Sequence, residues 1–206
     1  MQYLSLSGGA IAAIVVPIAV VLIIVISIVG WYISTKNGLI SLRNDMEESY
    51  SAMDVHMKKR YDLIPNLVET CKGYAKFESD TLRRVTEARN VALAASPSDK
   101  AAAEKIFGEA LTSFFNVVHE QYPDLKANSQ FNNLSSQLEH IEEEIARSRK
   151  FYNAKVKILN NKIEKFPSSI VANKMGLVRY SYFELDDITQ RNAPRVSFDD
   201  APRTRL

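Results

Sequence analysis

The stretch FNNLSSQLEHIEEEIARSRKFYNAKVKILNNKIEKF, residues 131–166, carries the most regular apolar pattern in the chain. Its apolar positions recur every three or four residues, a mean step of about 3.5 that is typical of an amphipathic helix with heptad-like packing. Asn128 is expected to cap this helix and Pro167 to stop it. The inward face is predicted to consist of Phe131, Leu134, Leu138, Ile141, Ile145, Ser148, Tyr152, Val156, Leu159, Ile163 and Phe166.

A second apolar stripe, with a mean step of about 3.6 residues, predicts a long helix over residues 36–75. This helix can continue the apolar segment that precedes it. Pro65 lies inside the helix, removes one backbone hydrogen bond, and is expected to bend it near residues 62–65. The predicted inward face is Leu39, Leu42, Met46, Tyr50, Met53, Met57, Tyr61, Ile64, Val68, Cys71 and Ala75.

Two shorter helices are predicted between the long ones. Ser79 is expected to cap the first, which ends near Ala95 and turns Leu82, Val85, Ala88 and Ala92 inward. Ser96 is expected to cap the second, with Pro97 in its first position and Asp99 completing a capping box. This helix runs to about Gln121, and its predicted inward residues are Ala102, Ile106, Ala110, Phe114 and Val117.

No segment alternates apolar and polar residues over the length of a strand, so the fold class is all-α. Short connections force neighbouring helices to run antiparallel. The sequence therefore predicts a single N-terminal transmembrane helix followed by an elongated antiparallel four-helix bundle. The expected domain limits are 1–35 for the tail and transmembrane helix, 36–183 for the bundle with an apolar C-terminal segment, and 184–206 for a disordered tail.

The transmembrane prediction depends on residues 1–35, which contain no Asp, Glu, Lys, Arg or His. The uncharged run 8–33 exceeds the roughly 20 residues that a spanning helix needs. Trp31 and Tyr32 lie at its C-terminal edge, where amphipathic rings favour the membrane interface. A cleaved signal peptide is disfavoured because the run is too long and no basic residue precedes it. The lysines and arginines that follow favour an external N-terminus and a cytoplasmic body.

The block around Pro65 contains the candidate interaction residues Arg60, Tyr61, Asp62, Pro65 and Asn66. The proline frees a carbonyl one turn back, near Tyr61. In a structural interpretation, Asn66 or Asp62 satisfies the freed groups. In a functional interpretation, the bend presents Arg60, Asp62 and Asn66 to a partner protein or a neighbouring subunit.

A second candidate segment follows Pro167 and is rich in apolar and aromatic residues. Lys174 and Arg179 interrupt it, a composition typical of a segment that lies in the membrane interface. The alternative is a segment folded over the open end of the bundle. The candidate membrane-proximal residues are Ile170, Met175, Leu177, Tyr180, Tyr182 and Phe183.

Several motifs together closely resemble the signature of the LemA family of bacterial membrane proteins. They are KRYDLIPNLVET at 59–70, KGYAK at 72–76, VTEAR at 85–89, YPDLKAN at 122–128, and the endings FP at 166–167 and YFE at 182–184. The resemblance covers about Asn37 to Glu184, with Cys71 and Phe77 where Val and His are usual. It implies one N-terminal transmembrane helix, an elongated helical domain and no known enzymatic activity. Some relatives carry a lipobox, which would place their domain outside the cytoplasm.

The residues themselves offer little catalytic chemistry. His56, His119 and His140 lack the glutamate three positions earlier that a di-iron bundle requires. No phosphate-binding loop, nucleophile elbow or zinc-protease motif occurs. A net charge of +2 argues against nucleic-acid binding, and Cys71, the single cysteine, is expected to be a small core residue. We therefore expect no enzyme, cofactor or metal.

The expected function is a non-enzymatic, membrane-anchored helical scaffold that self-associates in the bacterial inner membrane. Its partners would be the lipid bilayer and further copies of itself. Ala10, Ala13 and Pro17 offer a small-residue packing face, and the long helices exceed what the short ones cover, which favours a homo-oligomer. The alternative is an adaptor that binds another envelope protein, such as a membrane protease or signalling partner, in an envelope stress response.

Overall fold

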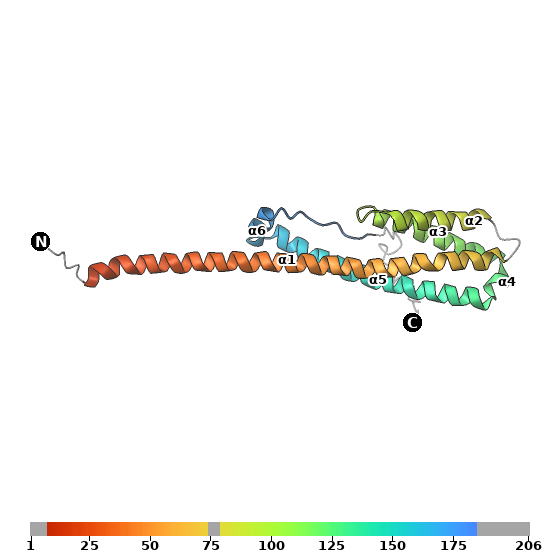
Figure 1. Ribbon diagram of the computed structural model, residues 1–206, viewed down its shortest axis with the longest axis horizontal. Helices are drawn as coiled ribbons and strands as arrows, with labels where there is room; N and C mark the ends of the chain where they lie inside the picture. The colour runs from red at the N-terminus through yellow and green to blue at the C-terminus, as the bar shows by residue number, and fades with distance from the viewer. Residues whose placement is uncertain (1–7, 74–78, 185–206) are drawn as a thin grey trace, which may run out of the picture. The chain divides into compact units, whose positions relative to one another are not determined.

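The computed structural model describes residues 8–73 and 79–184, and every regular element in these residues is a helix (Figure 1). No strand occurs in the described ranges, which agrees with the all-α prediction. The expected disordered tail, 184–206, lies outside them apart from Glu184. The helices are α1 (Gly8–Lys72), α2 (Ser79–Ala94), α3 (Lys100–Gln121), α4 (Pro123–Lys126), α5 (Ser129–Glu164) and α6 (Ser168–Lys174).

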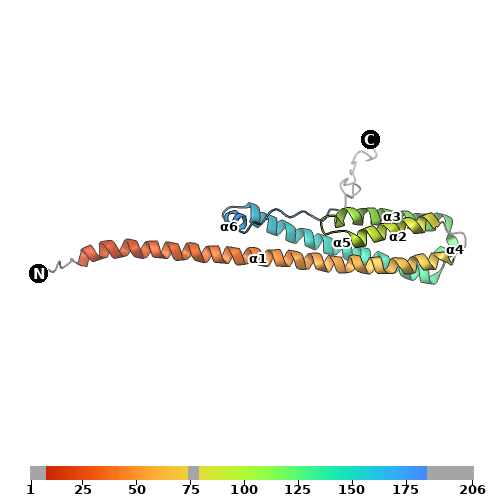
Figure 2. The same ribbon diagram turned by 45° about the horizontal axis from the view of Figure 1, so that its top comes forward.

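The chain forms two compact units, and helices α1 and α5 each contribute to both. The first unit combines Met1–Met57 with Glu143–Tyr182, and the second combines Lys58–Glu142 with Phe183–Leu206. In the second unit, α2 and α3 pack side by side (Figure 2). The four-helix bundle and the domain limits 1–35, 36–183 and 184–206 stay predictions.

Helix α1 begins with the apolar segment and continues without a break to Lys72, so it includes most of the helix predicted at 36–75. From Val15 onward it is long and apolar enough to cross a membrane, and none of that apolar window is buried. Ile26, for example, is 70% exposed. A side chain of this kind strongly favours an apolar solvent over water. The first part of α1 therefore has the properties of a membrane-spanning helix.

The predicted inward face of α1 is largely confirmed. Seven of its members are buried: Leu39, Met46, Met53, Met57, Tyr61, Ile64 and Cys71. Leu42, Tyr50 and Val68 are half-buried, and Leu67, which the sequence analysis omitted, is fully buried. The helix ends at Lys72, and Ala75 lies outside the described residues.

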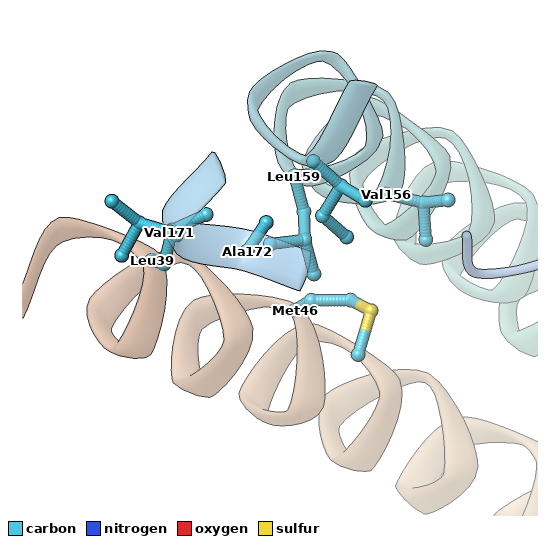
Figure 3. Packing of buried hydrophobic residues seen from close by; sticks show 7 residues of the cluster. Leu39, Met46, Val156, Leu159, Val171 and Ala172 are labelled. Atoms are coloured by element: carbon cyan, nitrogen blue, oxygen red, sulfur yellow. The ribbon is translucent and has the colours of Figure 1, made fainter. Parts of the chain in front are cut away.

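Three helices build the core of the first unit. Leu39 and Met46 come from α1, Val156, Leu159 and Ile163 from α5, and Val171 and Ala172 from α6 (Figure 3). The half-buried residues Tyr32, Leu42, Tyr152, Met175, Leu177, Tyr180 and Tyr182 pack around this cluster. The short helix α6 thus covers the seam between α1 and α5.

Helix α5 begins as predicted, because the Asn128 side chain accepts hydrogen bonds from the backbone N–H groups of Gln130 and Phe131, at 2.9 and 3.0 Å. Its inward stripe is confirmed for seven residues that are buried, but not for Phe166, which is 81% exposed. The helix ends at Glu164, so the helical spacing does not extend to Phe166.

The prediction for α3 was wrong in its start and in part of its inward face, since Phe114 is buried as predicted while Ala110 and Val117 are only half-buried. The helix begins at Lys100 rather than at Pro97, and the Ser96 hydroxyl donates to the Asp99 carboxylate at 2.6 Å. The buried residues are Lys100, Ala103, Glu104, Phe107, Leu111, Phe114 and Val118, while Ala102 and Ile106 are exposed. Two of the buried residues are charged, which concealed this face from a search for apolar periodicity.

Two short helices were not predicted. Helix α4 occupies the connection after Gln121, where the sequence predicts the end of a helix and no new one, and it buries Leu125 completely. Helix α6 forms within the segment that was treated only as apolar. Both begin beside a proline, Pro123 inside α4 and Pro167 just before α6, where the fixed φ of proline suits the start of a helix.

Neighbouring residues on α5 provide a test of the first unit. Leu159 is fully buried in the cluster, whereas Ile158 is 46% exposed. We expect Leu159→Ala to lower the free energy of unfolding by about 2–5 kcal/mol because it leaves a cavity. Ile158→Ala removes a similar number of atoms without a cavity and should change it far less. Urea unfolding of the full chain in detergent, followed by circular dichroism, measures both, and equal losses would contradict the assigned core.

Candidate functional site

The predicted interaction block divides between the interior and the surface of the second unit. Arg60 and Tyr61 are buried, at 3% and 1% exposure. Asp62, Pro65 and Asn66 are exposed. Helical geometry accounts for Asp62 and Asn66, which lie four residues apart on the face of α1 opposite Arg60. The structure therefore does not bring the five residues together at one surface.

The guanidinium of Arg60 is buried at the centre of an ion-pair network whose two carboxylates are the buried Glu104 and the half-exposed Glu142. It donates to Glu104 of α3 and to Glu142 of α5, and its carbon Cζ lies 4.8 Å from the centroid of the Phe107 ring. A planar cation above an aromatic face is stabilised by the partial negative charge on the face of the ring. One side chain of α1 thus bonds to two other helices of this unit.

Glu104 is the acidic partner that lies deepest in the interior. The Tyr61 hydroxyl donates to its carboxylate, and the Tyr61 ring packs edge-on against Phe107 with centroids 5.6 Å apart. Burial raises the pKa of Glu104 above its ordinary value of 4.5, an effect that the nearby charge of Glu142 reinforces. The charge of Arg60, the hydrogen bond from Tyr61 and the charge of Lys100 oppose it.

A second buried cation lies beside this network. Lys100 is only 6% exposed, and its Nζ donates to the backbone carbonyl of Ala92 at 2.9 Å. The same ammonium lies 5.7 Å from the centroid of the Tyr61 ring. A buried ammonium needs such partners, because leaving water otherwise costs several kcal/mol. Lys100 therefore joins the start of α3 to the end of α2 and to the ring of α1.

Pro65 frees the backbone carbonyl of Tyr61, as the sequence predicted, but the residue that donates to this carbonyl is not one of those predicted. Proline cannot donate to the carbonyl four residues earlier, which belongs to Tyr61. The Nε of Arg89, from α2, donates to that carbonyl at 3.1 Å. The prediction that Asn66 or Asp62 would satisfy it was wrong, because both side chains are on the opposite, exposed face. The expected bend near 62–65 stays a prediction, and α1 is helical throughout that range.

The sequence predicted neither the partners of Arg60, namely Glu104 and Glu142, nor the roles of Lys100 and Arg89. One signal was available: Met57, Arg60, Tyr61 and Ile64 have the spacing of a single helix face. A cation on an otherwise apolar face requires a carboxylate from another helix. Which carboxylate it meets depends on the packing of the helices, and the sequence alone does not give this.

The other reactive groups in the described residues offer no catalytic arrangement. Cys71 is fully buried, and burial raises the pKa of its thiol to about 12, so the thiol stays protonated and unreactive at neutral pH. No group of three or more His, Cys, Asp or Glu side chains suited to a metal ion occurs within 8–73 and 79–184.

The candidate membrane-proximal residues have three different environments. Met175, Leu177, Tyr180 and Tyr182 pack against the core cluster of the first unit. Ile170 is 56% exposed, and Phe183 is buried within the second unit. Contact of this segment with lipid stays a prediction for the exposed residues.

A buried amide holds the chain that follows α6. Asn160, which is 4% exposed, donates through its side-chain nitrogen to the Tyr180 carbonyl and accepts from the Tyr180 N–H, both at 2.9 Å. This pairing satisfies both sides of the amide and both polar groups of one backbone residue. It fixes the segment around Tyr180 against α5.

Fold and site together define an all-helical protein with an apolar N-terminal helix and a buried network of ion pairs. A sequence model of the LemA family matches residues 49–198, so the chain belongs to the LemA family. It is 28% identical to the Protein LemA of Metamycoplasma hominis, over 76% of this chain and 72% of that protein. It is 23% identical to the magnetosome protein MamQ 2 of Paramagnetospirillum magneticum, over 78% of this chain and 68% of the relative.

A further relative is the magnetosome protein MamQ of Magnetospirillum gryphiswaldense, 23% identical over 71% of this chain and 64% of the relative. Together with the exposed apolar helix, the family assignment supports a membrane-associated protein. The family match includes both the Pro65 block and the helices that supply the partners of Arg60.

Removing Arg60 should destabilise the second unit by leaving the Glu104 carboxylate buried without its main counter-charge. We expect Arg60→Met to lower the free energy of unfolding by about 3–5 kcal/mol at neutral pH. The matched control is Lys59→Met, because Lys59 is the exposed neighbour. The double variant Arg60→Met, Glu104→Gln should regain most of the loss, since it removes both buried charges.

The same experiment has a defined pH dependence. The pKa of Glu104 is raised in the folded protein, so the folded state takes up a proton more readily than the unfolded state. The resulting stabilisation is complete below pH 4.5 and is lost as the pH rises through the raised pKa. Without Arg60 the pKa rises further, so the deficit of Arg60→Met should be smallest in acid. Urea unfolding at acid and neutral pH measures it, and a deficit independent of pH would contradict the ion pair.

Proposed function

We propose that this LemA-family protein is a non-enzymatic, membrane-anchored helical scaffold of the bacterial inner membrane that self-associates. The observation that carries the proposal is helix α1, whose exposed apolar segment continues unbroken into residues that form the cores of both units. The membrane-spanning part of α1 is thus joined to the folded body by continuous helix, without an intervening linker. The buried polar groups Arg60, Glu104 and Lys100 bond helices of the second unit to one another.

Self-association is supported by the face of α1 that includes Ser27, Gly30 and Ser34. A Cβ added at Gly30 would meet no atom within 4 Å, so nothing in this chain requires a glycine there. Small residues at this spacing let a second transmembrane helix approach closely. Tethering in a membrane also raises the effective concentration at which copies meet. A second copy of α1 is therefore the partner proposed for this face.

Native mass spectrometry of the full chain in mild detergent tests self-association. We expect a mass of more than one chain for the natural sequence. Gly30→Leu fills the small-residue face and should shift the population toward the single-chain mass, whereas Val29→Leu, on a different face, should not. A single-chain mass for the natural sequence in several detergents would exclude the proposal.

We also propose that the N-terminus is external and that the body lies in the cytoplasm. The support is the difference in basic residues between the two sides of the apolar segment. Residues 1–7 contain no lysine or arginine, whereas Lys36, Arg43 and Lys58–Arg60 follow the segment.

Cysteine labelling in intact cells tests this orientation. Ala102→Cys lies at an exposed position of α3, and the natural Cys71 is buried. We expect a membrane-impermeant maleimide to leave Ala102→Cys unlabelled until the cells are permeabilised, and to label Ser5→Cys without permeabilisation. The reverse pattern would place the body outside the cytoplasm.

The adaptor hypothesis is the second candidate, and one observation favours it. Asp62, Pro65 and Asn66 share an exposed face of α1, directly behind the buried network. A partner protein of the envelope, such as a membrane protease or signalling protein, could bind an acidic and an amide side chain presented at this spacing. Crosslinking from Asn66 separates the hypotheses, because self-crosslinks support the scaffold and a distinct partner supports the adaptor.

A further inference from the structure

Helix α6 lies beside α1 at the edge of the charge-free segment. Lys174, the last residue of α6, places its Nζ 5.5 Å from the centroid of the Tyr32 ring. Tyr32 lies near the end of the segment without charged residues, which runs to Thr35. Tyrosine and lysine at such a position are typical of the boundary between lipid and water. Both residues belong to the first unit, where Figure 1 shows α6 next to α1.

Three apolar side chains around α6 face away from the core of this unit. Phe166 is 81% exposed, Ile170 is 56% exposed and Val178 is 73% exposed, while their neighbours Val171 and Ala172 are fully buried. Phe166 and Val178 are the two most exposed large apolar side chains in the described residues. Large apolar side chains that are this exposed, in one short segment of the chain, mark a surface that another phase or molecule covers.

Basic residues are frequent in the segment that contains these three apolar side chains. Between residues 162 and 179 the chain has four basic residues, Lys162, Lys165, Lys174 and Arg179, and one acidic residue, Glu164, for a net charge of +3. The acidic residue is paired with Arg179 at 3.5 Å. Apolar side chains within a basic rim match the interface of a membrane that contains anionic phospholipids.

We propose that α6 and its flanking residues are a membrane-docking surface, formed by Phe166, Ile170 and Val178 within a rim that includes Lys165 and Lys174. The apolar side chains enter the headgroup region of the bilayer that α1 enters, and the lysines lie among anionic phosphates. The proposal rests on the membrane anchor of the proposed function. It changes the set of lipid-facing residues predicted from the sequence, because Met175, Leu177, Tyr180 and Tyr182 pack on the core instead.

Continuity with α1 favours lipid as the occupant of this surface. The contact of Lys174 with Tyr32 places α6 at the level where the apolar helix ends, so a bilayer around that helix reaches α6 without any change in the unit. Two copies of the chain that met through this same segment would bring basic residues together, because residues 162–179 contain one acidic residue, Glu164, which is already paired with Arg179.

Spin labels on the full chain in vesicles test the docking surface. Single cysteines at Phe166 and Ile170 carry the label, and the buried Cys71, with its raised pKa, leaves the natural chain as the unlabelled control. The vesicles contain phosphatidylcholine and phosphatidylglycerol in equal amounts. Power saturation compares access of oxygen, which concentrates in lipid, with access of a water-soluble nickel reagent. We expect labels at both positions to lie about 5–10 Å below the headgroup surface.

Two control positions keep this proposal separate from the membrane anchor. A label at Val25→Cys reports insertion of α1, and a label at Ile158→Cys, exposed on α5, reports an aqueous site. If Val25 is in lipid while 166 and 170 match 158, the docking surface is excluded and the anchor stands. If Val25 is also aqueous, the anchor itself fails. Loss of access to both oxygen and nickel at 166 and 170 would mean that protein covers the surface, which also excludes lipid docking.

Charge reversal tests the basic rim. Lys165→Glu with Lys174→Glu should move the label at Ile170 toward water, because acidic side chains are repelled by anionic headgroups. Lys157→Glu is the matched control, since Lys157 is exposed on α5 away from the α6 segment. An unchanged depth at Ile170 would contradict the role assigned to the two lysines.

Discussion

A guanidinium in a helical core must be neutralised and hydrogen-bonded there, because the cost of removing it from water is several kcal/mol. In the second unit this constraint falls on Arg60, and carboxylates from α3 and α5 neutralise it and accept hydrogen bonds from its two terminal nitrogens. Apolar side chains tolerate many packings of similar volume, whereas a forked cation accepts few. Arg60 therefore selects which faces of α3 and α5 turn toward α1, and the positions of Glu104, Tyr61 and Phe107 follow from that selection.

Sequence periodicity was sufficient wherever helix faces are purely apolar. The apolar members of the stripes on α1 and α5 could mostly be predicted, because their burial depends on hydrophobicity, whereas Arg60 and Asn160 on the same helices are buried through polar partners. Asn128 could be assigned as a cap since its interaction with the next turn is local. The face of α3 could not be predicted in this way. Glu104 and Lys100 are buried through partners on other helices, and sequence periodicity assigns charged residues to water.

The same limit explains the correction at Pro65. The missing donor was evident from the sequence, because proline has no N–H. The replacement donor was not, since Arg89 is 24 residues further along the chain, on another helix. A local search considers Asp62 and Asn66, which lie on the wrong face of the helix. The sequence shows that the Tyr61 carbonyl loses its helical donor, but only the packing of α2 against α1 shows that Arg89 replaces that donor.

The pairing of Asn160 with Tyr180 determines how substitutions in this region would act. Asn160 recognises the main chain, so its two hydrogen bonds are independent of which side chain residue 180 carries. The side chain of residue 180 can therefore change with little effect on how the segment after α6 is held, provided that the new residue is not proline and so keeps its N–H. Position 160 has no such freedom: aspartate would lose the donor, and leucine would leave two backbone groups buried without partners. Residue 180 can therefore be substituted more freely than residue 160, because the contact uses the side chain of Asn160 but only the backbone of Tyr180.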